Sequence, residues 1–157
     1  MRNAEASRGR ILEAAMAEFS SYGIAGARVD RIAKTAGCNK NLIYIYFESK
    51  ETLFETVLQR SLAEGYEDVA FTPEDLGGYA GRVFDFTMAH PDFMRLMAWY
   101  ALELRGKVQP GRSAAFERKL VQVNAAQAEG IVGDAFSANF LVTAIMAIAV
   151  ADRKSVV

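Results

Sequence analysis

The stretch from Arg28 to Lys50, RVDRIAKTAGCNKNLIYIYFESK, constrains the fold of this chain more than any other part of the sequence. Its first half predicts a short helix, because apolar residues recur there at helical spacing, namely Val29, Ile32, Ala33 and Ala36. Gly37 follows where such a helix must stop, since glycine enters the left-handed backbone region without steric cost. Asn39 is a favoured N-cap for a second helix. The pattern predicts two helices joined by a tight turn.

The second helix of this pair has a single anchored edge. Between Lys40 and Phe47, the apolar residues that pair on one face are Ile43 and Phe47, four positions apart. The spacing leaves the other side chains pointing elsewhere: Lys40, Asn41, Leu42, Tyr44, Ile45 and Tyr46. A short helix with a polar and aromatic outer face suits insertion into a groove. The pattern therefore indicates a helix-turn-helix whose second helix reads DNA.

Composition favours a helical chain with a sizeable core. The chain has 157 residues, of which 52% are hydrophobic and 24% charged, and this fits one large or two small domains. With three prolines and no alternating runs of β-branched residues, we expect an all-α fold. One cysteine rules out an intramolecular disulfide and fits the reducing cytoplasm. We expect no leader and no membrane span, because the apolar run over residues 140–151 is shorter than the ~20 residues required.

Charge is divided unevenly along the chain. Residues 1–50 carry eight Lys or Arg and five Asp or Glu, a net charge of +3. Residues 51–157 carry ten and fourteen, a net charge of −4. The part with the turn motif is thus the basic part. An acidic remainder would repel phosphates and help to orient the basic end towards them.

Further helices are expected over residues 7–22, 49–70, 73–90, 91–104, 113–130 and 137–151. Ser7, Ser49 and Ser137 are the expected N-caps of three of them, and Thr72 is expected to cap the helix that begins at Pro73. Residues 109–111, Gln-Pro-Gly, predict a surface turn. The last helix is apolar on most sides, so a partner subunit is its natural cover and we expect a homodimer.

The motif residues resemble the N-terminal DNA-binding domain of the tetracycline-repressor (TetR) family of transcriptional regulators. The segments that carry the resemblance are ILEAAMAEFSSYG, IAKTAG and LIYIYFESKETLF. The sequence departs from the family pattern at several positions of the motif, namely Arg28, Cys38, Asn39, Asn41 and Leu42. Arg28 replaces the usual Thr or Ser, so the first helix of the motif lacks its hydroxyl cap. These departures bear on the operator sequence and leave the expected fold unchanged.

The resemblance implies a three-helix helix-turn-helix domain at residues 1–50, linked through a helix over residues 50–70 to a helical domain at residues 51–157. The second domain, which resembles the family loosely through HPDFMRLMAWYALEL and AAQAEGIVGDAF, would bind an effector and dimerise. The family usually closes with one more long helix than the sequence shows after residue 151. We therefore expect either an incomplete C-terminus or a dimer interface that differs from the family's.

Seven residues match positions that commonly contact DNA in the family: Arg28, Lys40, Asn41, Leu42, Tyr44, Tyr46 and Lys50. Physically, Lys40 can donate to guanine and Asn41 can pair with adenine, while Leu42 could meet a thymine methyl group. The two tyrosines suit phosphates or sugars, although core packing is the competing interpretation. Lys50 and Arg28 suit phosphates. Arg8 and Arg10, in the first helix, are either solvated or contact phosphate.

The aromatic and methionine residues of the second half predict walls for an apolar effector: Phe84, Phe86, Met88, Met94, Met97, Trp99 and Tyr100. Ordinary core packing is the competing interpretation for each of them. By the resemblance, a small apolar effector would bind between these helices and weaken binding to the operator.

No catalytic set, metal site or cofactor is expected. His90 precedes a proline and suits a helix boundary, and one Cys with one His is a poor supply of metal ligands. The sequence therefore predicts a cytoplasmic, homodimeric regulator, a repressor rather than an activator, that binds a palindromic double-stranded operator. Two alternatives stay open: a dimeric regulator without an effector, and a helical carrier of small molecules with no role at DNA.

Overall fold

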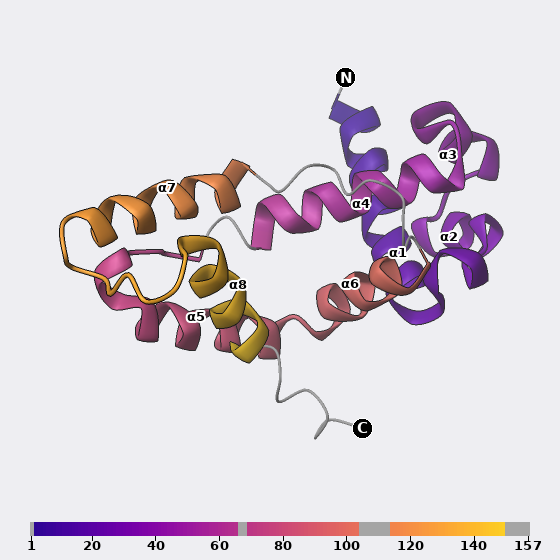
Figure 1. The fold of residues 1–157 in the computed structure, drawn as a ribbon. Coiled ribbons are helices and arrows are strands. Elements are labelled where there is room, and N and C mark those ends of the chain that lie inside the picture. Colours follow the sequence, from indigo (N-terminus) through magenta and orange to yellow (C-terminus); the bar gives the residue numbers. More distant parts are fainter. Residues whose placement is uncertain (1, 66–68, 104–113, 150–157) are drawn as a thin grey trace. The chain divides into compact units, whose positions relative to one another are not determined.

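The computed structural model describes residues 2–65, 69–103 and 114–149, and the regular elements within these ranges are all helices (Figure 1). The all-α fold predicted from the sequence is thus confirmed. The chain divides into two compact units: unit 1 contains residues 1–64 and 90–107, and unit 2 contains residues 65–89 and 108–157. The functional division at residue 50, which the family resemblance implies, stays a prediction. Among the described helices, none is long and apolar enough to cross a membrane.

Unit 1 is built from α1 (Arg2–Gly26), α2 (Val29–Ala36), α3 (Lys40–Phe47), α4 (Lys50–Gly65) and α6 (Pro91–Glu103). Aromatic rings join these helices in one core. Phe19 of α1 meets the ring of Phe54 of α4 edge-on at 5.2 Å, and Phe54 stacks on Tyr100 of α6 at 6.4 Å. Leu96 of α6 is completely buried in the same cluster. The helix-turn-helix is therefore packed on α1, and the core beneath it includes α6.

Helix ends in unit 1 differ from those predicted at two places. Ser7 is not the N-cap of α1, because the helix already begins at Arg2 and the Ser7 hydroxyl accepts a hydrogen bond from Arg10 in the next turn. Gly23 does interrupt the helical backbone, with φ 69° and ψ −176°, although a helical turn resumes up to Gly26. The helix after Ser49 ends at Gly65 and not near residue 70. Its predicted cap is confirmed, since the Thr52 amide donates to Ser49 Oγ at 3.0 Å.

Unit 2 contains a short 3₁₀ helix (η1, Pro73–Asp75), α5 (Leu76–Ala89), α7 (Ala114–Ala128) and α8 (Ala138–Ala149). Tyr79 and Val83 of α5 are fully buried with Ala149 of α8. Thr72 makes no capping hydrogen bond through its side chain, so that predicted cap is wrong. Ser137 does cap α8, because its hydroxyl accepts from the Phe140 amide at 3.2 Å. The turn expected at residues 109–111 lies outside the described residues.

Candidate nucleic-acid interface

The turn between α2 and α3 has the geometry that its sequence predicts. Gly37 adopts φ 65° and ψ 41°, the left-handed conformation that ends a helix, and the Cys38 amide then donates to the Ala33 carbonyl at 3.0 Å. Asn39 caps α3, since its Oδ1 accepts from the Asn41 amide at 2.9 Å. These local hydrogen bonds fix the direction of α3 where it leaves the turn.

Helix α3 buries one edge and exposes the other. Ile43 and Phe47, its two buried residues, keep 1% and 2% of their surface exposed. Lys40, Asn41 and Tyr44 are exposed. The same helix thus offers an ammonium, an amide and a phenol to solvent.

The other two contacts predicted on α3 are less accessible. Leu42 and Tyr46 are half-buried and pack against the core of unit 1. Ile45, in contrast, was not among the predicted contacts and is 74% exposed. The spacing argument already placed Ile45 away from the buried edge, so the signal was present in the sequence.

A tight turn joins α3 to α4. Glu48 has φ 61° and ψ −48°, and it is the one non-glycine residue with positive φ in the part of the chain that the structure describes. The Ser49 amide donates to the Phe47 carbonyl at 2.6 Å across it, which closes a γ-turn. This backbone conformation is strained for a residue with a side chain, and it sets α4 directly after the anchor Phe47.

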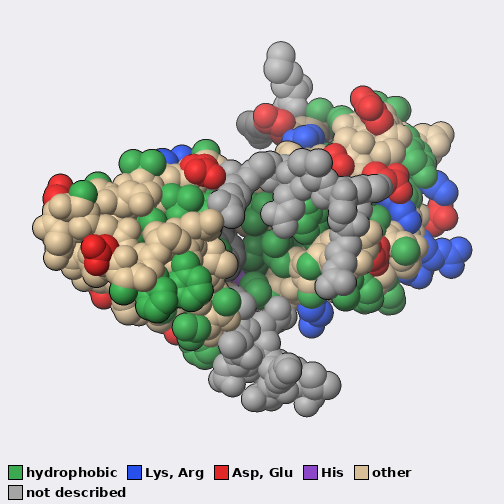
Figure 2. Space-filling view, in the orientation of Figure 1, with side chains coloured by type: hydrophobic (Ala, Val, Ile, Leu, Met, Phe, Trp, Pro, Cys, Tyr) green, Lys and Arg blue, Asp and Glu red, His purple; other side chains and the backbone are tan. Residues whose placement is uncertain are grey.

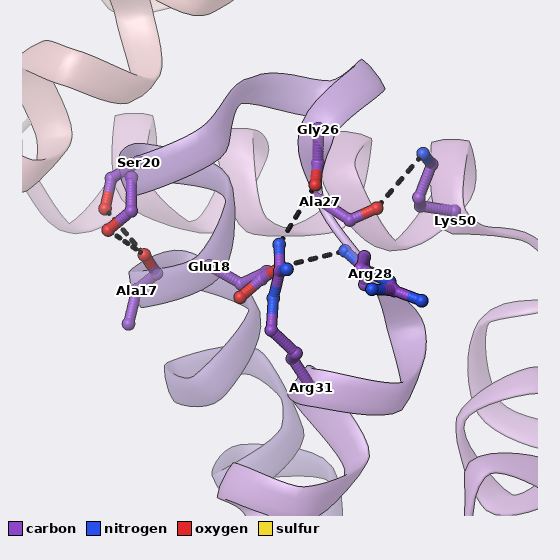
Figure 3. Close-up of polar contacts among 9 residues, drawn as sticks. Ala17, Glu18, Ser20, Gly26, Ala27, Arg28, Arg31 and Lys50 are labelled. Atoms are coloured by element: carbon purple, nitrogen blue, oxygen red, sulfur yellow. Dashed lines mark hydrogen bonds and ion pairs between the residues drawn. The ribbon is translucent and has the colours of Figure 1, made fainter.

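The start of α2 is held by α1 and not by a cap of its own (Figure 3). Arg28 gives α2 no capping side chain, as the sequence predicts. Glu18 of α1, 8% exposed, accepts from the Arg28 amide and from Arg31 Nε, each at 2.8 Å. The hydrogen bond to Glu18 raises the pKa of Arg31 above its ordinary value. Sequence reasoning missed this anchor, because its partners are ten and more residues apart and carry no periodic signal.

Three further cations near the helix-turn-helix, Lys50, Arg10 and Arg8, contact backbone carbonyls or an aromatic ring. Lys50, half-buried, donates to the Ala27 carbonyl at 3.3 Å, immediately before Arg28 (Figure 3). Arg10 of α1 donates to the Ala36 carbonyl at the end of α2, at 3.4 Å. The guanidinium of Arg8 lies 5.2 Å from the ring centroid of Phe47. α1 therefore contributes two arginines close to α2 and α3.

Lys40 and Asp30 form an ion pair across the two helices of the motif. Lys40 Nζ lies 2.9 Å from Asp30 Oδ1, and both side chains are exposed. The hydrogen bond and the charge of Lys40 lower the pKa of Asp30, and those of Asp30 raise the pKa of Lys40. In the face drawn in Figure 2, Lys and Arg side chains gather over the part of unit 1 that carries α2 and α3, with carboxylates among them.

The predicted effector-pocket residues fall in both units. Met94 and Tyr100 of α6 are buried in the core of unit 1, Met97 packs against it, and Trp99 Nε1 donates to the Ser20 carbonyl at 3.2 Å. The others belong to α5 in unit 2, where Phe84 packs beside Tyr79, Phe86 is half-buried and Met88 is 49% exposed. A shared pocket for these residues stays a prediction.

The helix-turn-helix and its exposed basic and polar surface define a DNA-binding protein. Comparison with known families specifies it further. Residues 11–57 match the family described as bacterial regulatory proteins, tetR family, and residues 75–156 match the tetracyclin repressor-like C-terminal domain. The chain belongs to the TetR family of transcriptional regulators.

Individual relatives agree with this assignment. The HTH-type transcriptional repressor SCO4008 of Streptomyces coelicolor is 39% identical over 151 residues, which cover 94% of this chain and 79% of that protein. The HTH-type transcriptional repressor NicS of Pseudomonas putida is 33% identical over 102 residues, 60% of this chain and 48% of that one. The crystal structure of SCO4942 from Streptomyces coelicolor superposes with a TM-score of 0.84 at 41% identity, covering 92% and 78% of the two chains.

The family and these relatives by name are regulators and not enzymes. They give no support to the alternative of a small-molecule carrier without a role at DNA.

Proposed function

We propose that this chain is a repressor that binds a palindromic operator as a homodimer, with α3 of each subunit in the major groove. The observation that carries the proposal is the division of α3 into a buried edge, Ile43 and Phe47, and an exposed edge with Lys40, Asn41 and Tyr44. Two such helices would enter successive major grooves roughly 34–36 Å apart. The repressor role is carried over from relatives that are named as repressors.

The seven predicted contacts divide by their chemistry and exposure. Lys40 and Asn41 would contact guanine and adenine, and Tyr44 a phosphate or sugar. Arg28 and Lys50 would contact phosphates, and the bond from Lys50 to the Ala27 carbonyl keeps its ammonium next to the start of α2. Leu42 and Tyr46 are less accessible, so we assign the thymine methyl contact first to Ile45, which is 74% exposed.

Residues 1–50 would then read the operator, while residues 51–157 would dimerise and respond to an effector in the cytoplasm. Dimerisation is supported by the large apolar side chains that unit 2 leaves exposed at and before α8, namely Phe136, Phe140 and Ile148. Their exposure of 50% and more is costly for a single subunit in water and would be relieved by a second copy.

A regulator without an effector is the second candidate. The packing of Met94 and Tyr100 in the core of unit 1 supports it, because these two of the seven expected pocket residues already have a role in the core. Operator affinity measured with and without a panel of small apolar molecules separates the two: an effector lowers the affinity, whereas no member of the panel would do so for the second candidate.

Selection from a random pool of duplexes tests DNA reading directly. The full chain is incubated with the pool and with heparin as competitor, and bound duplexes are amplified over several rounds. We expect enrichment of a palindrome whose half-sites are about one helical turn apart. Binding that heparin removes, with no enriched sequence, would contradict the proposal.

A further inference from the structure

Asp30 places a negative charge on the surface that is proposed to meet DNA. It lies in the first turn of α2, and its carboxylate is 2.9 Å from the ammonium of Lys40, the first residue of α3. The Asp30 side chain is 64% exposed and that of Lys40 is 44% exposed. The positive charge of Arg28, two residues earlier, also lowers the pKa of Asp30. The carboxylate therefore lies near two of the cations that are assigned to DNA.

The ion pair between Asp30 and Lys40 contributes little to the stability of the fold. Ion pairs between exposed side chains contribute little to stability, because water and salt screen them and both side chains lose freedom. The connection between α2 and α3 is already fixed by Gly37 and Asn39 through their backbone hydrogen bonds. A carboxylate close to phosphates, in contrast, weakens binding to every duplex. A carboxylate in the first turn of α2 stabilises that helix through its dipole, but this does not require the pairing with Lys40. The effect of the pairing is thus to be sought in DNA binding.

We propose that Asp30 is a specificity-determining residue, which orients Lys40 towards a base edge and cancels its charge towards the phosphates of non-specific DNA. This inference rests on the proposed role of Lys40 as a reader of guanine. A lysine ammonium carries three N–H donors, of which Asp30 takes one. The O6 and N7 atoms of a guanine can accept the other two, so the ion pair can persist in the specific complex.

In non-specific complexes the contacts are mainly to phosphates, and no guanine is matched to the position of Lys40. Their affinity comes from cations that displace counterions condensed on the phosphates, one counterion for each phosphate neutralised. A lysine whose charge is already balanced by a carboxylate displaces little. Asp30 therefore lowers the affinity for non-specific duplexes, and it keeps the side chain of Lys40 in place for the operator.

The test compares Asp30→Asn with Glu55→Gln, which removes the same charge from an exposed position of α4. Fluorescence anisotropy measures binding to the selected operator and to a scrambled duplex of equal composition, at several salt concentrations. For Asp30→Asn, we expect the salt slope on the scrambled duplex to steepen by about 0.9. With this change in slope, the substitution raises the affinity for the scrambled duplex by a factor that is about 3.5-fold larger at about 50 mM than at about 200 mM salt.

The ratio of operator affinity to non-specific affinity should fall for Asp30→Asn and stay unchanged for Glu55→Gln. In a Lys40→Ala background, Asp30→Asn should no longer change the ratio. An equal ratio for Asp30→Asn and Glu55→Gln overturns the inference, and so does an effect of Asp30→Asn that persists without Lys40.

Failure of the proposed function is recognised separately in the same experiment. If Lys40→Ala binds the operator as the wild type does, Lys40 is no reader and the inference fails with that assignment. If Lys40→Ala weakens operator binding while Asp30→Asn leaves the ratio unchanged, the reading helix stands and the role of Asp30 alone is overturned.

Discussion

Gly23 of α1 lies against Trp99 and Glu103 of α6, and its replacement tests the packing between these two helices. With φ 69° and ψ −176°, Gly23 occupies a backbone region that is essentially restricted to glycine. Beyond the break, Glu103 Oε2 accepts from the Ile24 amide at 3.0 Å and from the Ala25 amide at 2.9 Å. The last turn of α6 thus caps the helical turn with which α1 resumes.

The substitution Gly23→Ala destabilises the contact between α1 and α6 in two ways. The strained backbone conformation alone costs about 1–3 kcal/mol. The new methyl group would also overlap Glu103 Oε1 and stand 2.8 Å from Cε3 of Trp99, so these side chains must move. Displacing their hydrogen bonds, which include Trp99 Nε1 to the Ser20 carbonyl, costs roughly 0.5–1.5 kcal/mol for each bond. We expect the free energy of unfolding to fall by about 2–5 kcal/mol, a large share of the ~5–15 kcal/mol typical of folded proteins.

Urea denaturation at a fixed protein concentration measures this change. Trp99 is the single tryptophan of the chain, so its fluorescence reports on the contact between α1 and α6, while circular dichroism follows the helices as a whole. Gly9→Ala is the matched control, because Gly9 lies in the same helix and an added Cβ there meets nothing within 4 Å. That control should gain about 0.5–1 kcal/mol. A loss of less than ~1 kcal/mol for Gly23→Ala would refute the argument from strain and overlap.

Three further predictions concern the first residue of α4, the proposed reading helix α3 and the turn that follows α3. Lys50→Ala should weaken binding to all duplexes alike and make the salt slope shallower by about 0.9, and titrations that return an unchanged slope would remove Lys50 from the phosphate contacts. Asn41→Ala should relax specificity at one base pair of each half-site by roughly 1–3 kcal/mol, which competition with single-base operator variants would reveal. Glu48→Gly should raise the free energy of unfolding by ~0.5–2 kcal/mol, because relief of strain at φ 61° exceeds the entropy cost of glycine. Urea denaturation measures this change, and a loss of stability would show that the turn is unstrained.

The sequence predicts those parts of the motif that depend on near neighbours. Gly37 and Asn39 act on residues at most five positions away, and both were expected to do what the structure shows them doing. The buried pair Ile43 and Phe47 likewise follows from helical spacing alone. Such signals need no knowledge of the rest of the fold.

The contacts that hold the motif in place could not be predicted in this way. Glu18 bonds Arg28 and Arg31 from another helix, and Glu103 bonds amides that precede it by nearly eighty residues. A carboxylate in a sequence carries no mark of a distant partner, and its default interpretation is a solvated charge. Apolar composition has a similar limit, because it does not separate Met94 and Tyr100 as core residues from residues that line a pocket.

Because α6 belongs to unit 1, a displacement of α6 can affect the helices that are proposed to bind DNA. α6 shares a core with α1 and α4 through Leu96 and Tyr100, and Glu103 fixes its end to α1. α1 in turn places Arg8 over the ring of Phe47 on α3. A displacement of α6 must therefore strain α1 or move it, because packed cores deform little, and movement of α1 would carry the anchor of the reading helix with it. By reciprocity, operator binding should change the fluorescence of Trp99 on α6; an unchanged emission at saturating operator would mean that α6 and the reading helix are not coupled.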